Sequence, residues 1–175
     1  MTGRCPWALT PGEMQEYHDA EWGRSEATEQ AYFERLTLEA FQSGLSWATI
    51  LAKRPRFREL FADFYVVAIA DFGPAEEEAL MADAGIVRNR LKVVSTIRNA
   101  QATITLRESG GLDEFVDRFR PEVAPPYEQT LTAESQALSK ALKKAGFAFV
   151  GPTTMHALQQ ALGAFNPHHP DCYLS

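Results

Sequence analysis

The chain has 175 residues, which suits one domain and is long enough to bury a hydrophobic core. Hydrophobic residues make up 45% and charged residues 23%, as in soluble globular proteins, and no apolar run approaches the roughly 18 residues that span a bilayer. The net charge of −6 argues against attraction of nucleic acid by the surface as a whole.

The first long helix is expected to begin after Thr28, a residue type that caps helix N-termini. Apolar residues at helical spacing follow, and Gly44 interrupts them. The spacing resumes at Trp47 and is expected to end at Pro55, because proline breaks a helix interior.

The middle of the chain continues the helical pattern. Gly73-Pro74 followed by three glutamates predicts a helix start, and Gly85 is expected to stop that helix. Residues 88–106 predict another helix. Residues 64–70 fit either a short strand or a buried helical turn, and periodicity does not decide between them.

The last third of the chain predicts two helices joined by a short connector. Residues 121–132 form an irregular, proline-containing connector between two helical lobes of one domain, residues 1–175. A helix from about Ala133 to Gly146 and a second helix from Pro152 to Gly163 then follow. Such a helix-hairpin-helix, about residues 133–163, can hold a DNA phosphate on free N–H groups, although ordinary helical hairpins share the pattern.

Metal-ligand residue types gather at the two ends of the chain. Cys5 and His18 lie near the start, and His168, His169 and Cys172 lie near the end. Two thiolates and two imidazoles suit a tetrahedral zinc site, which would join termini 1–22 and 166–175. The alternatives are a disulfide between the cysteines, or unrelated thiols and surface histidines. The N-terminus lacks the apolar segment of a signal peptide, so we expect a cytoplasmic protein with reduced thiols.

Charge is unevenly distributed along the chain. Three windows without any acidic residue, 40–58, 84–107 and 135–170, hold 12 of the 17 basic residues. Each window alone is typical of a solvated helix face. Together they favour a polyanionic partner for one face of an acidic protein.

A single carboxylate, Glu39, lies in an otherwise apolar stretch ahead of Gly44 and Trp47. Burying it requires a partner. That partner is either an arginine, which would make the carboxylate structural, or a cationic ligand. In the second case Trp7, Tyr17, Trp22 and Trp47 would supply flat surfaces for stacking. Ordinary core packing is the alternative for each aromatic residue taken singly.

These residues together resemble the 3-methyladenine DNA glycosylase I family, within the helix-hairpin-helix glycosylase superfamily. The resemblance covers nearly the whole chain. Its motifs are Arg4-Cys5-x-Trp7, the segments 17–23, 38–47, 83–90 and 138–144, Gly146-Phe147-x-Phe149-Val150-Gly151 and Asn166-x-His168-x3-Cys172.

The resemblance implies an all-helical enzyme with one structural zinc ion, which excises 3-methyladenine from alkylated double-stranded DNA. The zinc ligands would be Cys5, His18, His168 and Cys172. Glu39 would be the catalytic, base-binding carboxylate, Trp47 the stacking residue, and Trp7, Tyr17 and Trp22 further pocket residues. The residues implied to contact DNA are Gly44 and Leu45, which fill the gap left by the extruded nucleotide, and Lys143, Lys144, Phe149, Gly151 and Thr153 around the hairpin.

The sequence departs from the family and superfamily patterns at some positions, and two alternative functions stay open. Asn166-Pro167-His168 follows the hairpin where many superfamily members place a catalytic aspartate, and no lysine is positioned for Schiff-base chemistry, so we expect hydrolysis without strand cleavage. Met14 stands where relatives often carry tyrosine. The alternative functions are a zinc-containing DNA-binding module without excision activity and a hydrolase with a catalytic zinc. A monomer is the simplest expectation.

Overall fold

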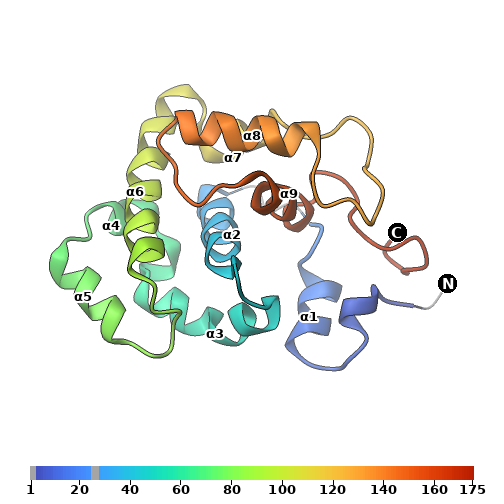
Figure 1. The fold of residues 1–175 in the computed structure, drawn as a ribbon, viewed down its shortest axis with the longest axis horizontal. Helices are drawn as coiled ribbons and strands as arrows, with labels where there is room; N and C mark the ends of the chain where they lie inside the picture. Colours follow the sequence, from blue (N-terminus) through green and yellow to red (C-terminus); the bar gives the residue numbers. More distant parts are fainter. Residues whose placement is uncertain (1–2, 25–27) are drawn as a thin grey trace.

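The computed structural model describes residues 3–24 and 28–175, which fold into helices and connecting segments without a β-strand in this part of the chain. The termini lie next to each other (Figure 1), where the Tyr173 N–H donates to the Gly3 carbonyl oxygen over 2.9 Å. The described elements are η1 (Pro6–Ala8), α1 (Glu13–Ala20), α2 (Glu29–Gln42), α3 (Trp47–Leu60), η2 (Ala62–Phe64), α4 (Val66–Ala70), α5 (Pro74–Ala82), α6 (Arg90–Leu106), η3 (Arg107–Ser109), α7 (Gly111–Asp117), α8 (Ala133–Lys144) and α9 (Pro152–Ala161).

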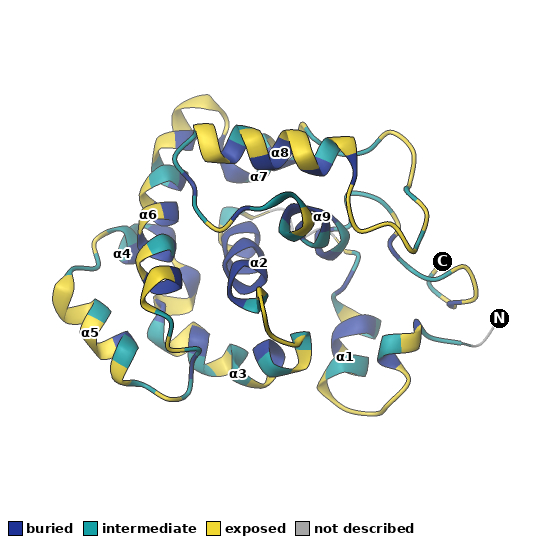
Figure 2. Cartoon of the chain, in the orientation of Figure 1, coloured by how far each residue is buried: buried dark blue, intermediate teal, exposed yellow. Residues whose placement is uncertain are grey.

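Helix α2 forms the centre of the fold. Every residue from 31 to 41 on it is buried, so it shows no solvated face (Figure 2). Helices α3, α6, α7 and α9 pack around it. A helix that is buried on all sides belongs to the core rather than to the surface. Its sequence still contains charged residues, and each of them must therefore be accommodated inside the protein.

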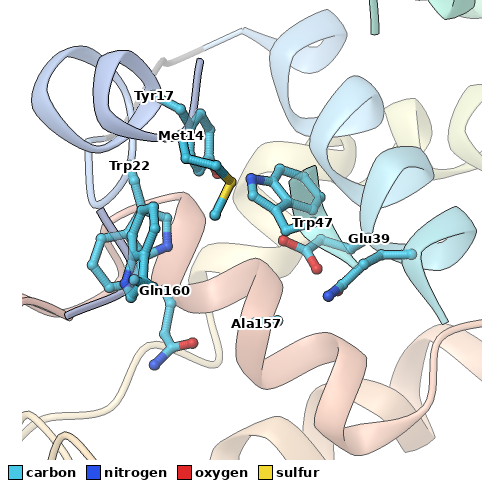
Figure 3. Close-up of a pocket in the computed structure, with 9 residues that line it drawn as sticks. Met14, Tyr17, Trp22, Glu39, Trp47, Ala157 and Gln160 are labelled. Atoms are coloured by element: carbon cyan, nitrogen blue, oxygen red, sulfur yellow. The ribbon is translucent and has the colours of Figure 1, made fainter. Parts of the chain in front are cut away.

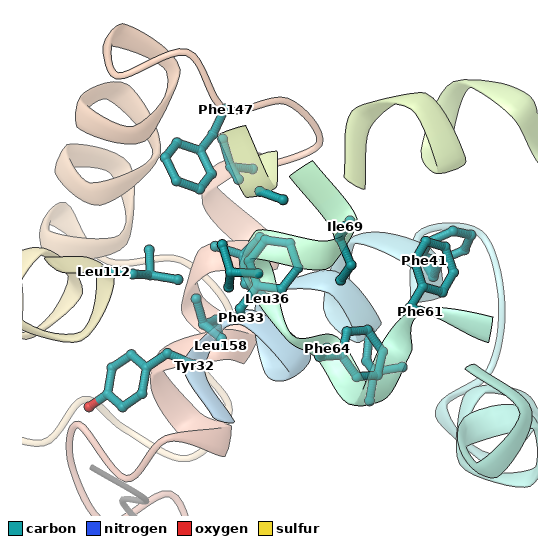
Figure 4. Packing of buried hydrophobic residues seen from close by; sticks show 14 of the residues in the cluster. Tyr32, Phe33, Leu36, Phe41, Phe61, Phe64, Ile69, Leu112, Phe147 and Leu158 are labelled. Carbon is teal, nitrogen blue, oxygen red and sulfur yellow. The ribbon is translucent and has the colours of Figure 1, made fainter. Parts of the chain in front are cut away.

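The hydrophobic core extends from α2 in two directions (Figure 4). Phe33 and Leu36 of α2 are fully buried, and on one side Phe41 packs edge-to-face on Phe57, with ring centroids 4.8 Å apart. On the other side Leu112 and Leu158 complete the same cluster. The central helix therefore connects α3 to α7 and α9 through one continuous core.

Most of the expected helix boundaries are confirmed. The Thr28 hydroxyl caps α2 by accepting from the Ala31 N–H over 3.2 Å. The Glu76 carboxylate accepts from the Gly73 N–H over 2.8 Å at the start of α5. The α5 helix ends at Ala82, three residues before the expected stop. These helix starts could be predicted from the sequence because a side chain close by accepts a hydrogen bond from a free N–H group.

One prediction for the α3–α4 region is wrong, and one question that the sequence left open is decided by the structure. Helix α3 does not end at Pro55 but continues to Leu60. Proline removes one hydrogen bond from the helix, and the burial of Phe57 and Phe61 on the far side of it outweighs that loss. Residues 64–70, left open between strand and helix, contain α4, whose Val66 and Ile69 are buried.

Helices α8 and α9 pack against each other and are joined by residues 145–151, named here the 145–151 connector. The expected irregular segment 121–132 precedes α8. Thr132 and Ser135 exchange hydrogen bonds between side chain and backbone at the start of α8. The predicted layout of helix, short glycine-containing connector and helix is therefore present.

Candidate active site

A pocket of about 150 Å³ opens where α1, the ends of α2 and α3, and α9 meet (Figure 3). It lies between elements that are far apart in the sequence. Its walls are mostly apolar and aromatic, with few polar groups, as is usual for a small-molecule site. The residues that line it are Trp7, Met14, Tyr17, Trp22, Glu39, Gln42, Trp47, Ala157 and Gln160.

Glu39 lies in the last turn of α2 and directs its carboxylate into this pocket (Figure 3). Its exposed fraction is only 6%. Within residues 3–24 and 28–175 its carboxylate has no hydrogen bond and no ion pair. Burial raises the pKa of Glu39 to about 8, although the charge of Arg35 one turn earlier lowers that pKa in part. A buried carboxyl group without a partner suits the binding of a cation.

The sequence left open that an arginine forms an ion pair with Glu39. Arg35, one turn earlier on α2, is directed to another carboxylate instead. Its Nη2 lies 2.6 Å from Oε1 of Glu21, which follows α1. Its guanidinium also lies 5.8 Å from the ring centroid of Tyr17. Arg35 therefore joins α2 to the segment after α1 and stabilises the pocket wall, while the Glu39 carboxylate remains available.

The expected aromatic residues come together around the carboxylate. The rings of Tyr17 and Trp47 lie 5.3 Å apart, and those of Trp7 and Trp22 meet edge-to-face at 5.0 Å. In the described part of the chain, the Tyr17 hydroxyl and the Trp47 Nε1 are buried without a hydrogen-bond partner. Burial raises the pKa of Tyr17, so its hydroxyl stays a donor at neutral pH. Buried polar groups are normally satisfied, so these two indicate a ligand.

The structure adds pocket residues that the sequence did not reveal. Gln42 lies one turn after Glu39 on α2, and Gln160 lies one turn after Ala157 on α9. Spacing of three residues puts each pair on one helix face, which is the only signal that the sequence held for them. Met14, which the resemblance to the family had already indicated as a pocket position, lines the pocket as well.

Three of the four expected metal ligands form one buried cluster. The ligand atoms of Cys5, His18 and Cys172 all lie within 4.8 Å of one another, and the two cysteines are free thiols. His18 directs Nδ1 to Asp19 Oδ1 at 2.9 Å, which leaves Nε2 for the cluster, 3.5 Å from Cys172 Sγ. Hydrogen bonds from Arg4 hold the pKa of Asp19 below its usual range.

The expected fourth ligand, His168, lies beside this cluster. Its ring centroid is 5.1 Å from that of His18, and its Nδ1 lies 2.8 Å from Asn166 Oδ1. Its Nε2 is buried and has no hydrogen-bond partner in the described chain. The neighbouring His169 instead accepts the Asp171 N–H at Nδ1 and donates its own backbone N–H to Cys5 Sγ. Two sulfur atoms and one imidazole nitrogen therefore meet at one place, and the ring of His168 lies beside them. Thiolates and imidazoles are ligands that zinc prefers.

A groove of about 440 Å³ adjoins the pocket and shares Glu39, Gln42 and Ala157 with it. One side of the groove is the turn formed by residues 43–46, named here the 43–46 turn. Gly44 has φ +83°, a conformation that favours glycine, and places Leu45 at the tip with 40% of its surface exposed. The other side carries Thr153 and Thr154 at the start of α9.

The 145–151 connector and the adjacent helix ends carry the remaining expected DNA contacts. Lys143 and Lys144 are exposed in the last turn of α8, and Gly151 precedes Pro152 at the start of α9. Phe149 is 37% exposed and has φ +56°, which is uncommon for a residue with a side chain. Such backbone strain is concentrated at functional sites.

The expected basic face is smaller than the charge windows suggested. Acidic residues from other parts of the chain pair with five of the arginines in those windows: Arg54 and Arg58 with Glu34, Arg56 with Asp83, Arg90 with Glu77, and Arg107 with Glu29. Lys92 is buried as well, so it adds nothing to a basic surface.

No helix in the described chain is long and apolar enough to cross a membrane.

Known proteins share this sequence and fold. The model of the methyladenine glycosylase family matches residues 7–175. The DNA-3-methyladenine glycosylase of Haemophilus influenzae is 39% identical over 98% of this chain and 97% of its own length. DNA-3-methyladenine glycosylase 1 of Escherichia coli K12 is also 39% identical, over 97% of this chain and 95% of its own.

Solved structures agree with these relatives. A crystal structure of a 3-methyladenine DNA glycosylase I has a TM-score of 0.92 and 37% identity, and covers 98% of both chains. A Staphylococcus aureus structure that describes 3-methyladenine recognition has a TM-score of 0.90 and 29% identity, and covers 98% of this chain and 95% of its own. The chain therefore belongs to the methyladenine glycosylase family, that is, to the 3-methyladenine DNA glycosylase I enzymes.

Proposed function

We propose that this protein removes 3-methyladenine from alkylated double-stranded DNA by hydrolysing the N-glycosidic bond, without cleaving the strand. The observation that carries the proposal is the buried Glu39 carboxyl group, unpaired within the described chain, at the wall of an aromatic pocket. Family relatives support the substrate class, since one similar structure, of 28% identity, is a complex with 3-methyladenine.

The pocket selects a cationic base. At pH 7 a carboxyl group with a pKa of about 8 is ionised at a cost of about 1.4 kcal/mol. A positive charge about 4 Å away returns about 4 kcal/mol at an effective dielectric constant near 20. The cation therefore makes the ionised form of Glu39 the favoured one. A neutral base receives no such compensation, so the carboxylate distinguishes a purine methylated at N3 from an undamaged one.

The aromatic residues and Glu39 hold the base after it leaves the duplex. Extruding a nucleotide costs a few kcal/mol. Stacking on Trp47 offsets part of that cost, and the Tyr17 hydroxyl and Trp47 Nε1 supply donors that have no partner in the described chain. Glu39 accepts hydrogen bonds from the edge of the base. Leu45 at the tip of the 43–46 turn fills the gap in the stack.

The chemical step makes a small demand on the protein. N3 methylation leaves a positively charged purine, which is already a good leaving group. As its bond to C1′ breaks, a water molecule adds to C1′ and loses a proton to solvent, so the products are free base and an abasic strand. The residues that line the pocket include no lysine, so no Schiff base forms with the sugar.

A zinc ion bound by Cys5, His18, His168 and Cys172 would be structural. Four protein ligands would complete the coordination sphere, so the ion would hold the chain termini together and activate no water. His168 lies 4.9 Å from Trp22 between ring centroids, and His18 lies 5.2 Å from Trp7. The histidines that would hold the ion therefore also contact two aromatic residues of the pocket wall.

DNA binding is assigned to the groove beside the pocket. The exposed lysines at the end of α8 and the N–H groups near Gly151 and Thr153 would bind the phosphate backbone. The 43–46 turn faces the start of α9 across the groove. We take the protein to act as a cytoplasmic monomer, which can be checked by sizing in solution.

The test uses duplex DNA that carries 3-methyladenine. We expect free 3-methyladenine in the supernatant and an intact strand until alkali cleaves it at the abasic site. Binding without base release would establish the DNA-binding module instead. Strand cleavage without alkali would contradict the hydrolytic mechanism. A bound water on zinc, seen by X-ray absorption, would favour a catalytic metal.

A further inference from the structure

Helix α6 carries two side chains that bind backbone on either side of the groove. One binds the 43–46 turn, which lines the groove, and the other binds the 145–151 connector, which leads into the start of α9 on the other side. Lys92 is only 6% exposed, and its ammonium group donates to the carbonyl oxygens of Phe41 at 2.8 Å and Ser43 at 2.7 Å. These carbonyls belong to the end of α2 and the start of the 43–46 turn. No N–H group of α2 donates to them, because the last carbonyl groups of a helix lack an intrahelical donor.

Asn99 binds the 145–151 connector in a similar way. Its Nδ2 donates to the Ala148 carbonyl oxygen at 3.0 Å, and its Oδ1 accepts from the Ala148 N–H at 2.8 Å. This pair holds the residue before Phe149, the residue with the left-handed backbone. Figure 1 shows the connector between α8 and α9 passing beside α6.

The spacing of the two residues makes α6 a rigid support. Lys92 and Asn99 are seven residues apart, which places them on one face of the helix about 10 Å apart along its axis. Both are buried, and Val93, Ile97 and Ala100 of the same helix belong to the core. The distance between the 43–46 turn and the 145–151 connector is thus set by one well-packed helix.

We propose that Lys92 and Asn99 are positioning residues, which hold the 43–46 turn and the 145–151 connector at the separation needed to extrude a nucleotide. The inference rests on the proposed function, since it assigns Leu45 to the duplex stack and the connector to the DNA backbone. A displacement of about 1 Å in a supporting residue can lower a rate a hundredfold. Neither residue lines the base pocket, so their effect is confined to duplex DNA.

The test compares Lys92→Met and Asn99→Leu with Gln101→Met. Gln101 lies on α6 and donates to the Ala70 carbonyl oxygen at 3.1 Å, so its variant loses a similar bond on the same helix away from the groove. Single-turnover release of 3-methyladenine from duplex DNA is expected to fall at least tenfold in Lys92→Met and Asn99→Leu. The Gln101 variant should release base within twofold of the wild-type rate. Lys92→Arg, which keeps the positive charge and has enough N–H donors for both carbonyl oxygens, should recover most of the loss.

Two further readouts keep the inference separate from the proposed function. Binding of free 3-methyladenine, followed by tryptophan fluorescence, should change less than twofold in the folded variants. A 2-aminopurine beside a tetrahydrofuran abasic analogue reports unstacking even if no base is released, and its signal should drop in both variants. Unchanged release and unstacking would overturn the inference, as would an equal loss of free-base binding. If Lys92→Met does not fold, Lys92→Gln, whose side chain is shorter and carries no charge, replaces it. If the wild type itself releases no 3-methyladenine, the proposed function is refuted, whatever the variants do.

Discussion

Replacing Glu39 with glutamine should make the protein more stable, and increasingly so as the pH rises. The carboxyl group has a pKa of about 8 in the folded protein, against 4.5 as its ordinary value. Between these two pH values the native state retains a proton that the unfolded chain has lost, so the free energy of unfolding falls as the pH increases. The contribution of Glu39 is fully present below pH 4.5 and is lost as the pH passes 8.

The size of the effect follows from the same two pKa values. Their difference corresponds to at most about 5 kcal/mol, and relaxation around the ionised carboxylate reduces this figure. We therefore expect Glu39→Gln to be about 2 to 4 kcal/mol more stable than the wild type at pH 9 and nearly equal to it at pH 5. A site that binds a cation at the expense of stability is typical of functional pockets.

The assay is urea unfolding followed by tryptophan fluorescence at both pH values. Glu34→Gln is the matched control, because Glu34 lies on the same helix and burial alone would raise its pKa, yet hydrogen bonds from Arg58 and Arg54 lower it. That variant should be less stable than the wild type at pH 9. The reasoning would be refuted if Glu39→Gln gave no gain at pH 9, or the same gain at both pH values.

Substitutions at three other positions test separate parts of the site. Leu45→Ala should lower single-turnover release of 3-methyladenine from duplex DNA about tenfold and leave binding of the free base unchanged, and equal losses in both assays would contradict a role in the DNA stack. Trp47→Ala should weaken binding of free 3-methyladenine by about 1 to 3 kcal/mol in calorimetry, whereas Trp47→Phe should retain most of the affinity; an equal loss in both variants would contradict stacking. Purified wild type should contain one zinc per chain by elemental analysis, and Cys172→Ser should contain less and unfold at a lower temperature. A wild type free of zinc, or a metal content unaffected by Cys172→Ser, would remove the zinc assignment.

Much of the fold could be predicted because caps and glycines mark the helix ends locally. The Thr28 hydroxyl caps α2, the Glu76 carboxylate accepts from the Gly73 N–H at the start of α5, and Pro152 occupies the first position of α9. Each start is therefore marked within a short stretch of sequence. The continuation of α3 beyond Pro55 could not be predicted, because it depends on Phe57 packing against a ring from α2. Helix α7, which begins at two glycines, also escaped prediction for lack of a local cap.

The site residues also fall into those that the sequence indicated and those that only the structure reveals. The segments 17–23 and 38–47 indicated Tyr17, Glu39 and Trp47 as pocket residues, and the structure brings all three to one pocket. Each segment holds several of the lining residues close together in sequence, which made them readable. Gln160 comes from a distant helix and carries no signal of its own. The charge windows overstated the basic face, since folding brings Glu34 and other acids from outside the windows onto their arginines. Local chemistry is readable from sequence, whereas partners brought together by folding are not.

The central claim is tested most directly by measuring release of 3-methyladenine from alkylated duplex DNA by the wild type and by Glu39→Gln. A hydrogen bond to a charged group contributes about 1.5 to 3 kcal/mol, so we expect the glutamine variant to be slower by a factor of about 10 to 150. Because that variant is expected to be the more stable protein, loss of activity cannot be assigned to unfolding. Equal rates for the two proteins would contradict the assignment of Glu39 and the proposed basis of selectivity.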